Sequence, residues 1–216
     1  SEDKYLTFEV ERKTIEIPMV TSKMLDNNIG YVAVYEFEET TSEQFNQAID
    51  ALTAQGMKGL IIDLRDNPGG LVNSATAILD RILSKDQLLV YTVDKNGKKQ
   101  EEYTEDDETI NVPISVLING NSASASEIVS GCLQDYGKAK LVGTTSFGKG
   151  IVQYVLPLGD GSAIKLTSAK YYTPNGRNIH GTGIDPDVEV ELNSDSETDT
   201  QLEKAQEIVL QEIQAE

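Results

Sequence analysis

Short apolar runs alternate with amphipathic segments along residues 29–143. Some of the apolar runs are continuous, as in GLIIDL at 59–64, which is typical of strands buried on both faces. The segment 41–55 instead repeats apolar residues at intervals of three and four, which predicts a helix with one buried face. Strands and helices in alternation predict an α/β domain with right-handed crossovers and a largely parallel sheet.

The same reading predicts the individual elements. Strands are expected at 5–10, 29–37, 59–64, 88–93, 100–104, 114–118, 140–142, 151–156 and 163–168. Helices are expected at 41–55, 71–83, 126–136 and 201–214. Asn96-Gly97 lies between two of the strands and is a strong hairpin signal, so we expect an antiparallel element beside the parallel sheet.

The charge and composition of the chain argue against several classes of protein function. The chain has 216 residues and a formal net charge of −18, which argues against binding to nucleic acid or to anionic membrane surfaces. No apolar run approaches the roughly 20 residues that span a bilayer, and the first residues do not read as a signal peptide. Cys132 and His180 are the sole residues of their kinds, which excludes a disulfide within the chain and most metal sites.

A serine-rich segment, NGNSASASEIVSG at 119–131, joins a predicted buried strand to a predicted helix. In open α/β sheets this junction is where sites form, and a helix N-terminus favours developing negative charge. Ser122, Ser124 and Ser126 are therefore candidate nucleophiles. Serine is also a preferred helix N-cap, so a structural role fits the same residues. The segment lacks the last glycine of G-x-S-x-G, so it does not match the α/β-hydrolase elbow.

A nucleophilic serine needs a base. His180 has no obvious carboxylate partner in the sequence, which is more typical of a surface residue. A lysine has an ordinary pKa of about 10.4 and serves as a base only where apolar surroundings disfavour its charged form. Lys149 lies between two glycines, just before an apolar strand, and fits such a setting as well as that of a solvated turn.

The stretch GTTSFGKG at 143–150 also suggests a phosphate-binding loop. Gly150 stands where that motif has the serine or threonine that holds magnesium, and the following residues predict a strand, whereas a phosphate loop opens a helix. Nucleotide binding is therefore disfavoured.

The turn DLRDNPGG at 63–70 follows another buried strand. Gly69 or Gly70 would offer a main-chain N–H to an oxyanion, and the residue after the nucleophile, Ala125, would supply a second. An ordinary strand-to-helix turn fits the segment equally well. We expect Asp63 and Arg65 to form a structural ion pair.

Together these segments resemble the C-terminal processing peptidases, the tail-specific proteases of the S41 type. The resemblance rests on five ordered blocks: GYVAVYEF (30–37), GLIIDLRDNPGG (59–70), NSASASEIVSGCLQDYGKAKLVG (121–143), FGKGIVQ (147–153) and YYTPNGRNIHGTGIDPDVEV (171–190). It implies Ser124 as the nucleophile, Lys149 as the general base and Gln153 as the residue that positions the lysine. If Lys149 and Gln153 share one extended strand, their i and i+4 side chains face the same side.

The resemblance also implies a crotonase/ClpP-like α/β core with a strand-rich cap or flanking element. Its domains would be a remnant of a PDZ exit strand and linker at 1–20, the protease core at 21–192, and an acidic loop and C-terminal helix packing on the core at 193–216. The implied activity is a serine endopeptidase that cleaves polypeptides near their C-termini through an acyl-enzyme, without metal or cofactor. A homo-oligomer of the full-length enzyme and an extracytoplasmic location are implied as well.

Two alternatives remain open at this point. One is a peptide-binding scaffold of the same fold without catalysis, gripping a chain by strand addition. The other is acyl-CoA chemistry on the crotonase-like core.

Overall fold

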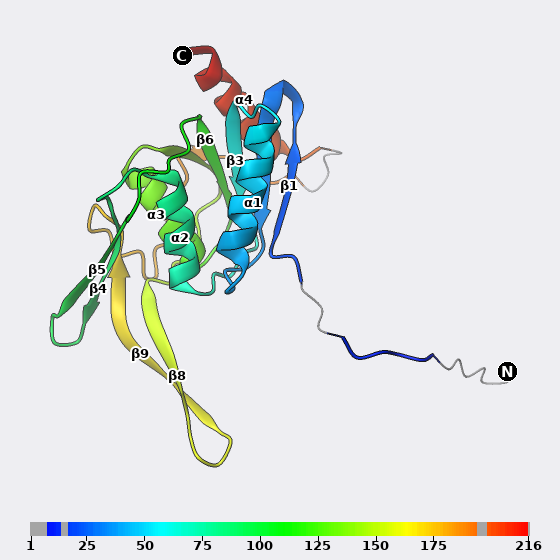
Figure 1. Cartoon of the computed structure of the whole chain (residues 1–216). Coiled ribbons are helices and arrows are strands. Elements are labelled where there is room, and N and C mark those ends of the chain that lie inside the picture. Colours follow the sequence, from blue (N-terminus) through cyan, green and yellow to red (C-terminus); the bar gives the residue numbers. More distant parts are fainter. Residues whose placement is uncertain (1–7, 14–16, 194–197, 216) are drawn as a thin grey trace.

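A six-stranded sheet forms the centre of the molecule (Figure 1). The computed structural model describes residues 8–13, 17–193 and 198–215. The strands pair in parallel except for the antiparallel edge strand β1. In spatial order they are β1 (Val20–Met24), β2 (Ile29–Val34), β3 (Gly59–Asp63), β6 (Ile114–Ile118), β7 (Ala139–Gly143) and β10 (Val188–Glu189).

Helices cover both faces of this sheet. Because side chains alternate along a strand, Leu60 and Ile62 of β3 pack into the cluster under one set of helices, while Ile61 packs into the cluster under Val209. The helices that cover the face of Leu60 and Ile62 are α1 (Thr41–Ala54), α2 (Val72–Ile82) and α3 (Ala125–Asp135), and the opposite face is covered by α4 (Thr200–Ala215).

Among the described residues, no helix has the length and apolarity needed to cross a membrane.

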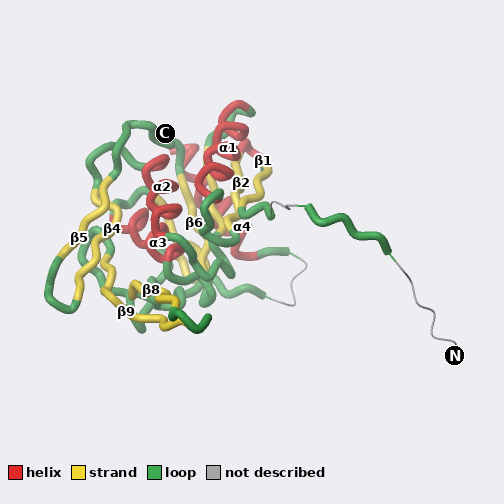
Figure 2. The backbone as a smooth tube through the Cα atoms, turned by 60° about the horizontal axis from the view of Figure 1, so that its bottom comes forward, coloured by secondary structure: helices red, strands yellow, loops and turns green. Residues whose placement is uncertain are grey.

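A second sheet of four antiparallel strands lies on the side of the molecule away from β1 (Figure 2). Asn96-Gly97 makes the expected hairpin turn in it, with Gly97 at φ +81°. The other hairpin projects well beyond the body of the molecule, and its first strand is an edge of the sheet (Figure 1). In spatial order the strands are β5 (Lys99–Tyr103), β4 (Leu88–Asp94), β9 (Ala163–Tyr172) and β8 (Ile151–Pro157).

The expected α/β core with a parallel sheet and a separate strand-rich element is confirmed. The pattern missed β1, whose sequence VTSKM is mixed because the strand is an exposed edge. It also missed β10, which has two residues and is too short to show a period. The strand expected at 5–10 is wrong for residues 8–10, which have no regular structure, and its first part lies outside the described residues.

An ion-pair network ties the end of β3 to the start of α4. The expected pair between Asp63 and Arg65 is present at 2.6 Å, and Arg65 also binds Asp199 at 2.8 Å. The Tyr31 hydroxyl donates to Asp63 at 2.7 Å, and burial together with the Asp63 charge raises the pKa of Tyr31. The network joins three segments that are far apart in the sequence, and so it holds α4 against the sheet.

Replacing Val209 with aspartate tests the packing of α4. Val209 is fully buried, and a Cβ built on Gly59 would lie 2.2 Å from its Cγ1. The new carboxylate would have no partner between helix and sheet, so we expect the free energy of unfolding to fall by about 3–5 kcal/mol. Urea denaturation followed by circular dichroism measures this free energy of unfolding. Glu203→Asp, on the exposed side of α4, keeps the charge of that position and should change the free energy of unfolding by less than about 0.5 kcal/mol. Equal losses in the two variants would contradict the burial of Val209 against the sheet.

Candidate active site

Ser124 lies at a sharp turn between β6 and α3. Its backbone has φ 56° and ψ −112°, a conformation that residues with a side chain rarely adopt. Such strain persists only where the surroundings enforce it, and it is frequent at active sites. The turn has the same design as the strained strand-to-helix elbow of α/β hydrolases, although the sequence lacks the last glycine of that motif.

The structure separates the three candidate serines. The Ser122 hydroxyl donates to the Leu64 carbonyl at 2.7 Å, and the Ser126 hydroxyl donates to the Asn67 carbonyl at 3.0 Å. Both of these serines are fully buried, whereas Ser124 is half-buried at the head of α3. Ser124 is therefore the serine of this segment that a substrate can reach.

A buried carboxylate, that of Glu127, holds the turn and the Phe147-Gly148-Lys149-Gly150 loop together. Its Oε1 accepts hydrogen bonds from the Ser146 hydroxyl at 2.5 Å and the Gly148 N–H at 2.7 Å. Its Oε2 accepts from the N–H groups of Ser124 and Lys149, both at 2.8 Å. Glu127 is fully buried, so these four bonds compensate the cost of taking its charge out of water.

The shared oxygen brings Ser124 and Lys149 together. Their main-chain nitrogens each lie 2.8 Å from Glu127 Oε2, so they are no further apart than twice that distance. The Lys149 side chain is half-buried. It forms no ion pair or hydrogen bond with any other described residue. The main chains of Ser124 and Lys149 are thus close, while their side chains share no hydrogen bond in the structure.

Two glycines allow the lysine loop to pack against the segment after β9. A Cβ on Gly148 would lie 2.8 Å from the Gly183 nitrogen, and a Cβ on Gly150 would lie 2.7 Å from the His180 nitrogen. The Gly181 N–H donates to the Gly148 carbonyl at 2.9 Å. The side chain of His180 is exposed, and its main chain is what supports the loop. The strand β8 follows the loop where a phosphate-binding loop would open a helix.

The glycine turn lies directly against Ser124. A Cβ built on Gly69 would be 2.7 Å from Ser124 Cβ and 2.9 Å from the Ala125 nitrogen. The Gly69 N–H is already used, because it donates to Asn67 Oδ1 at 2.8 Å. Within the described part of the chain, the N–H groups of Gly70 and Ala125 donate no hydrogen bond. These two donors are therefore free for a ligand.

Two functional residues, Asn67 and Glu127, were missed from the sequence. The buried Asn67 amide donates to the Val34 carbonyl at 2.8 Å, and the Asn67 carbonyl accepts the Ala123 N–H at 3.0 Å. It thus joins β2, the glycine turn and the serine turn. The spacing Ser124-x-x-Glu127 is that of a capping box, a signal that would have singled out the glutamate. No local signal marks the asparagine.

Gln153 has a different neighbour from the one that the strand argument assumes. Its amide donates to the Thr167 hydroxyl at 3.2 Å. Strand β8 begins at Ile151, after Lys149, and its register shifts between Val152 and Gln153. The assumption that Lys149 and Gln153 share one regular strand is therefore wrong, and the positioning role of Gln153 stays a prediction.

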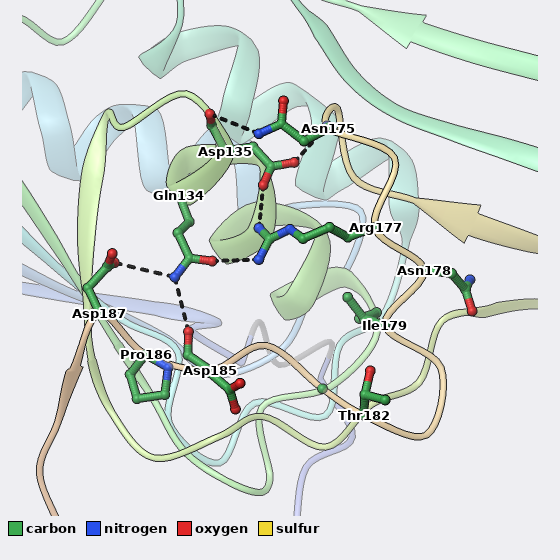
Figure 3. Close-up of a pocket in the computed structure, with 11 residues that line it drawn as sticks. Gln134, Asp135, Asn175, Arg177, Asn178, Ile179, Thr182, Asp185, Pro186 and Asp187 are labelled. Atoms are coloured by element: carbon green, nitrogen blue, oxygen red, sulfur yellow. Dashed lines mark hydrogen bonds and ion pairs between the residues drawn. The ribbon is translucent and has the colours of Figure 1, made fainter.

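A surface pocket is lined by the last residues of α3 and by the segment after β9 (Figure 3). That helix has 11 residues and is about 16 Å long. Arg177 pairs with Asp135 and donates to Gln134 at 2.9 Å, and Gln134 donates to the Asp185 carbonyl at 3.0 Å. The polar side chains of this pocket thus bind one another and fasten the segment after β9 to α3. Thr182 and Gly183 also line the pocket, and their main chains lie against Gly148, so the pocket extends from the end of α3 toward the lysine loop.

Glu127→Gln tests the carboxylate bridge. A glutamine has one acceptor oxygen and turns an NH₂ group toward two of the four donors. We expect the free energy of unfolding to fall by about 2–4 kcal/mol and amide exchange at residues 146–150 to accelerate. Hydrogen-exchange mass spectrometry measures the local effect. The exposed Glu43→Gln is the matched control. Unchanged exchange in Glu127→Gln would show that the carboxylate does not hold the loop.

Comparisons with known proteins identify relatives of this chain. The carboxy-terminal-processing protease of Bartonella bacilliformis is 42% identical over 198 residues, covering 88% of the chain and 44% of that protein. The carboxy-terminal processing protease CtpB of Bacillus subtilis is 41% identical over 192 residues, covering 87% and 40%. The solved structure of the photosystem II D1 C-terminal processing protease aligns with a TM-score of 0.73 at 31% identity, covering 92% of the chain and 54% of that structure.

The chain spans less than half the length of the two curated relatives. The match to peptidase family S41 itself runs over residues 28–190, which contain both the serine turn and the lysine loop. The chain therefore belongs to peptidase family S41.

Proposed function

We propose that this chain is the catalytic core of a serine endopeptidase that uses Ser124 as nucleophile and Lys149 as general base. The observation that carries the proposal is the single Glu127 oxygen that binds the N–H groups of both residues at 2.8 Å. A nucleophile and a base must lie within hydrogen-bond reach of each other during catalysis. Main chains held this close allow the hydroxyl and the amine to meet.

In the proposed reaction the Ser124 hydroxyl attacks a peptide carbonyl carbon while Lys149, in its neutral form, takes the hydroxyl proton. The lysine then gives this proton to the leaving amine, and an acyl-enzyme remains on Ser124. A water molecule, deprotonated by the same amine, attacks the ester. The lysine then returns this proton to the Ser124 oxygen as the acyl bond breaks, which releases the new C-terminus and restores both groups. The lysine has no competing carboxylate among the described side chains, which suits this shuttling of one proton.

The oxyanion of the tetrahedral intermediate would be held by the N–H groups of Gly70 and Ala125. Both donors are unused within the described residues, whereas the Gly69 N–H is committed to Asn67. Ala125 is the first residue of α3, so the helix dipole adds to its hydrogen bond. This argument favours Gly70 over Gly69 as the donor, with Gly69 serving to let the turn approach Ser124 closely.

The substrate would be a polypeptide cut near its C-terminus, since the two curated relatives are named carboxy-terminal processing proteases. We extend the same likeness to an extracytoplasmic location and to a homo-oligomer of the full-length protein. Gln153 would act through Lys149 as a positioning residue. For this it must leave Thr167, to which it donates in the structure.

Changing Lys149 to alanine or arginine tests the base. Alanine has no basic group, and arginine stays protonated, so neither accepts the proton of Ser124. We expect kcat for a peptide substrate to fall by about 10²–10⁴-fold or more in both variants. The exposed Lys140→Ala, on β7, is the matched control and should keep its rate. Hydrolysis near the wild-type rate in Lys149→Ala would exclude the Ser-Lys pair.

Labelling with a fluorophosphonate tests the nucleophile. The reagent forms a covalent bond with an activated serine hydroxyl, and mass spectrometry of the digested protein locates it. We expect the label on Ser124 and none on Ser122 or Ser126, whose hydroxyls are buried and bonded to main-chain carbonyls. Peptide binding without any labelling would instead support a scaffold that does not cleave.

A further inference from the structure

The β8–β9 hairpin carries a contiguous set of exposed apolar side chains. The register pairs Tyr154 with Leu166 and Leu156 with Ile164, so these four side chains share one face of the hairpin. Their exposed fractions lie between 45% and 60%. A set of this size on one hairpin face differs from scattered exposed residues and marks an interaction surface.

The outer edge of the same hairpin is unpaired. Strand β8 pairs with β9 on one side and is the last strand of its sheet on the other. The Leu158 N–H donates to the Ser162 carbonyl at 2.7 Å, and antiparallel strands alternate between bonded and unbonded pairs. The N–H and C=O groups of Ile151, Gln153 and Val155 therefore face away from β9. In the described part of the chain none of these groups has a partner.

This free edge begins beside the candidate base. Lys149 precedes Ile151 by two residues, which is about 7 Å of extended chain. A strand that paired with the outer edge of β8 would thus lead into the site that contains Ser124 and Lys149. Pro157, whose nitrogen carries no hydrogen, ends the row of donors on the far side. The usable edge covers the first five residues of β8, 151–155.

We propose that the outer edge of β8 binds the substrate polypeptide as an added strand, with the apolar face of the hairpin receiving its alternate side chains. This inference rests on the proposed peptidase function and names how that site holds its substrate. Main-chain hydrogen bonds to Ile151, Gln153 and Val155 would supply affinity for any extended sequence. Contacts with Tyr154 and Leu156 would select apolar residues at every second position.

Charge supports a polypeptide with a free C-terminal carboxylate as the occupant. The chain as a whole carries a net charge of −18. Apart from Lys149, which the proposed reaction requires in its neutral form, the charged residues between 144 and 173 are Lys165 and Lys170 against the single acid Asp160 at the tip. This locally basic hairpin favours an anionic chain end on a molecule that otherwise repels one. The net charge of −18 disfavours a second copy of this chain as the occupant of the edge, because two such molecules repel one another.

Val155→Pro and its matched control Val155→Ala test the edge. The N–H of Val155 faces away from β9, so proline removes a donor of the outer edge without removing a bond of the hairpin, while alanine keeps the donor and trims the side chain. Binding is measured by fluorescence anisotropy in a Ser124→Ala background. The probe is a fluorescein-labelled decapeptide in which valine alternates with serine and which ends in a free carboxylate.

We expect Val155→Pro to weaken the binding of this decapeptide about tenfold, from the loss of one or two main-chain hydrogen bonds, and Val155→Ala to weaken it less than threefold. In the active enzyme, Val155→Pro should raise KM by a similar factor and leave the rate of fluorophosphonate labelling unchanged. If the wild-type protein is not labelled at Ser124, the proposed function fails. If labelling is normal and both variants bind the decapeptide like wild type, the proposal for the edge fails.

Two decapeptides methylated on alternate backbone nitrogens, one on the odd and one on the even residues, repeat the test without altering the protein. At least one should bind about tenfold more weakly than the parent, because its methyl groups face β8 and block pairing. Equal affinity of all three decapeptides would overturn the proposal. A wild-type dimer that Val155→Pro dissociates, with unchanged decapeptide affinity, would also overturn it, because the edge would then belong to a second copy.

Discussion

The candidate site depends on one buried carboxylate. Glu127 accepts four hydrogen bonds, and its two oxygens reach two segments that are more than twenty residues apart in the sequence. A charge buried to this degree is costly unless each acceptor is used, so the segments must come together for the domain to fold. The close approach of the Ser124 and Lys149 main chains is therefore coupled to the stability of the core.

The glycines near the site have a related role. Gly69 allows the turn after β3 to approach Ser124, and Gly148 allows the lysine loop to lie against the segment after β9. In each case a methyl group would come within 3 Å of another main-chain atom. The turn after β3 also contains Gly70, whose N–H, like that of Ala125, donates no hydrogen bond within the described residues. Main-chain groups thus make up a large part of the candidate site.

The two sheets contribute different features to the candidate site. The parallel sheet and its helices hold the serine turn through buried contacts such as those of Asn67, and they tolerate little movement. The second sheet begins its edge strand two residues after Lys149 and extends into solvent with an apolar face. A rigid site with an exposed strand edge leading into it is suited to an extended polypeptide and poorly suited to a small metabolite, which is held in an enclosed pocket.

The sequence by itself determined the alternation of strands and helices, the hairpin at Asn96-Gly97 and the segments that carry Ser124, Lys149 and the glycine pair. These features are local, because apolar periodicity and turn chemistry are properties of neighbouring residues. The short edge strands β1 and β10 were not predicted from the sequence, because strands of five and two residues at the edge of a sheet show little hydrophobic periodicity.

Only the tertiary structure decided which serine is accessible, which glycine N–H is free, and that Glu127 and Asn67 join the parts. The hydroxyls of Ser122 and Ser126 are used by carbonyls at Leu64 and Asn67, nearly sixty residues away. A hydrogen bond between distant segments leaves no mark in the local pattern, because any serine there has the same composition and spacing. Which donors are occupied, and which stay free for a substrate, follows from how the chain packs on itself.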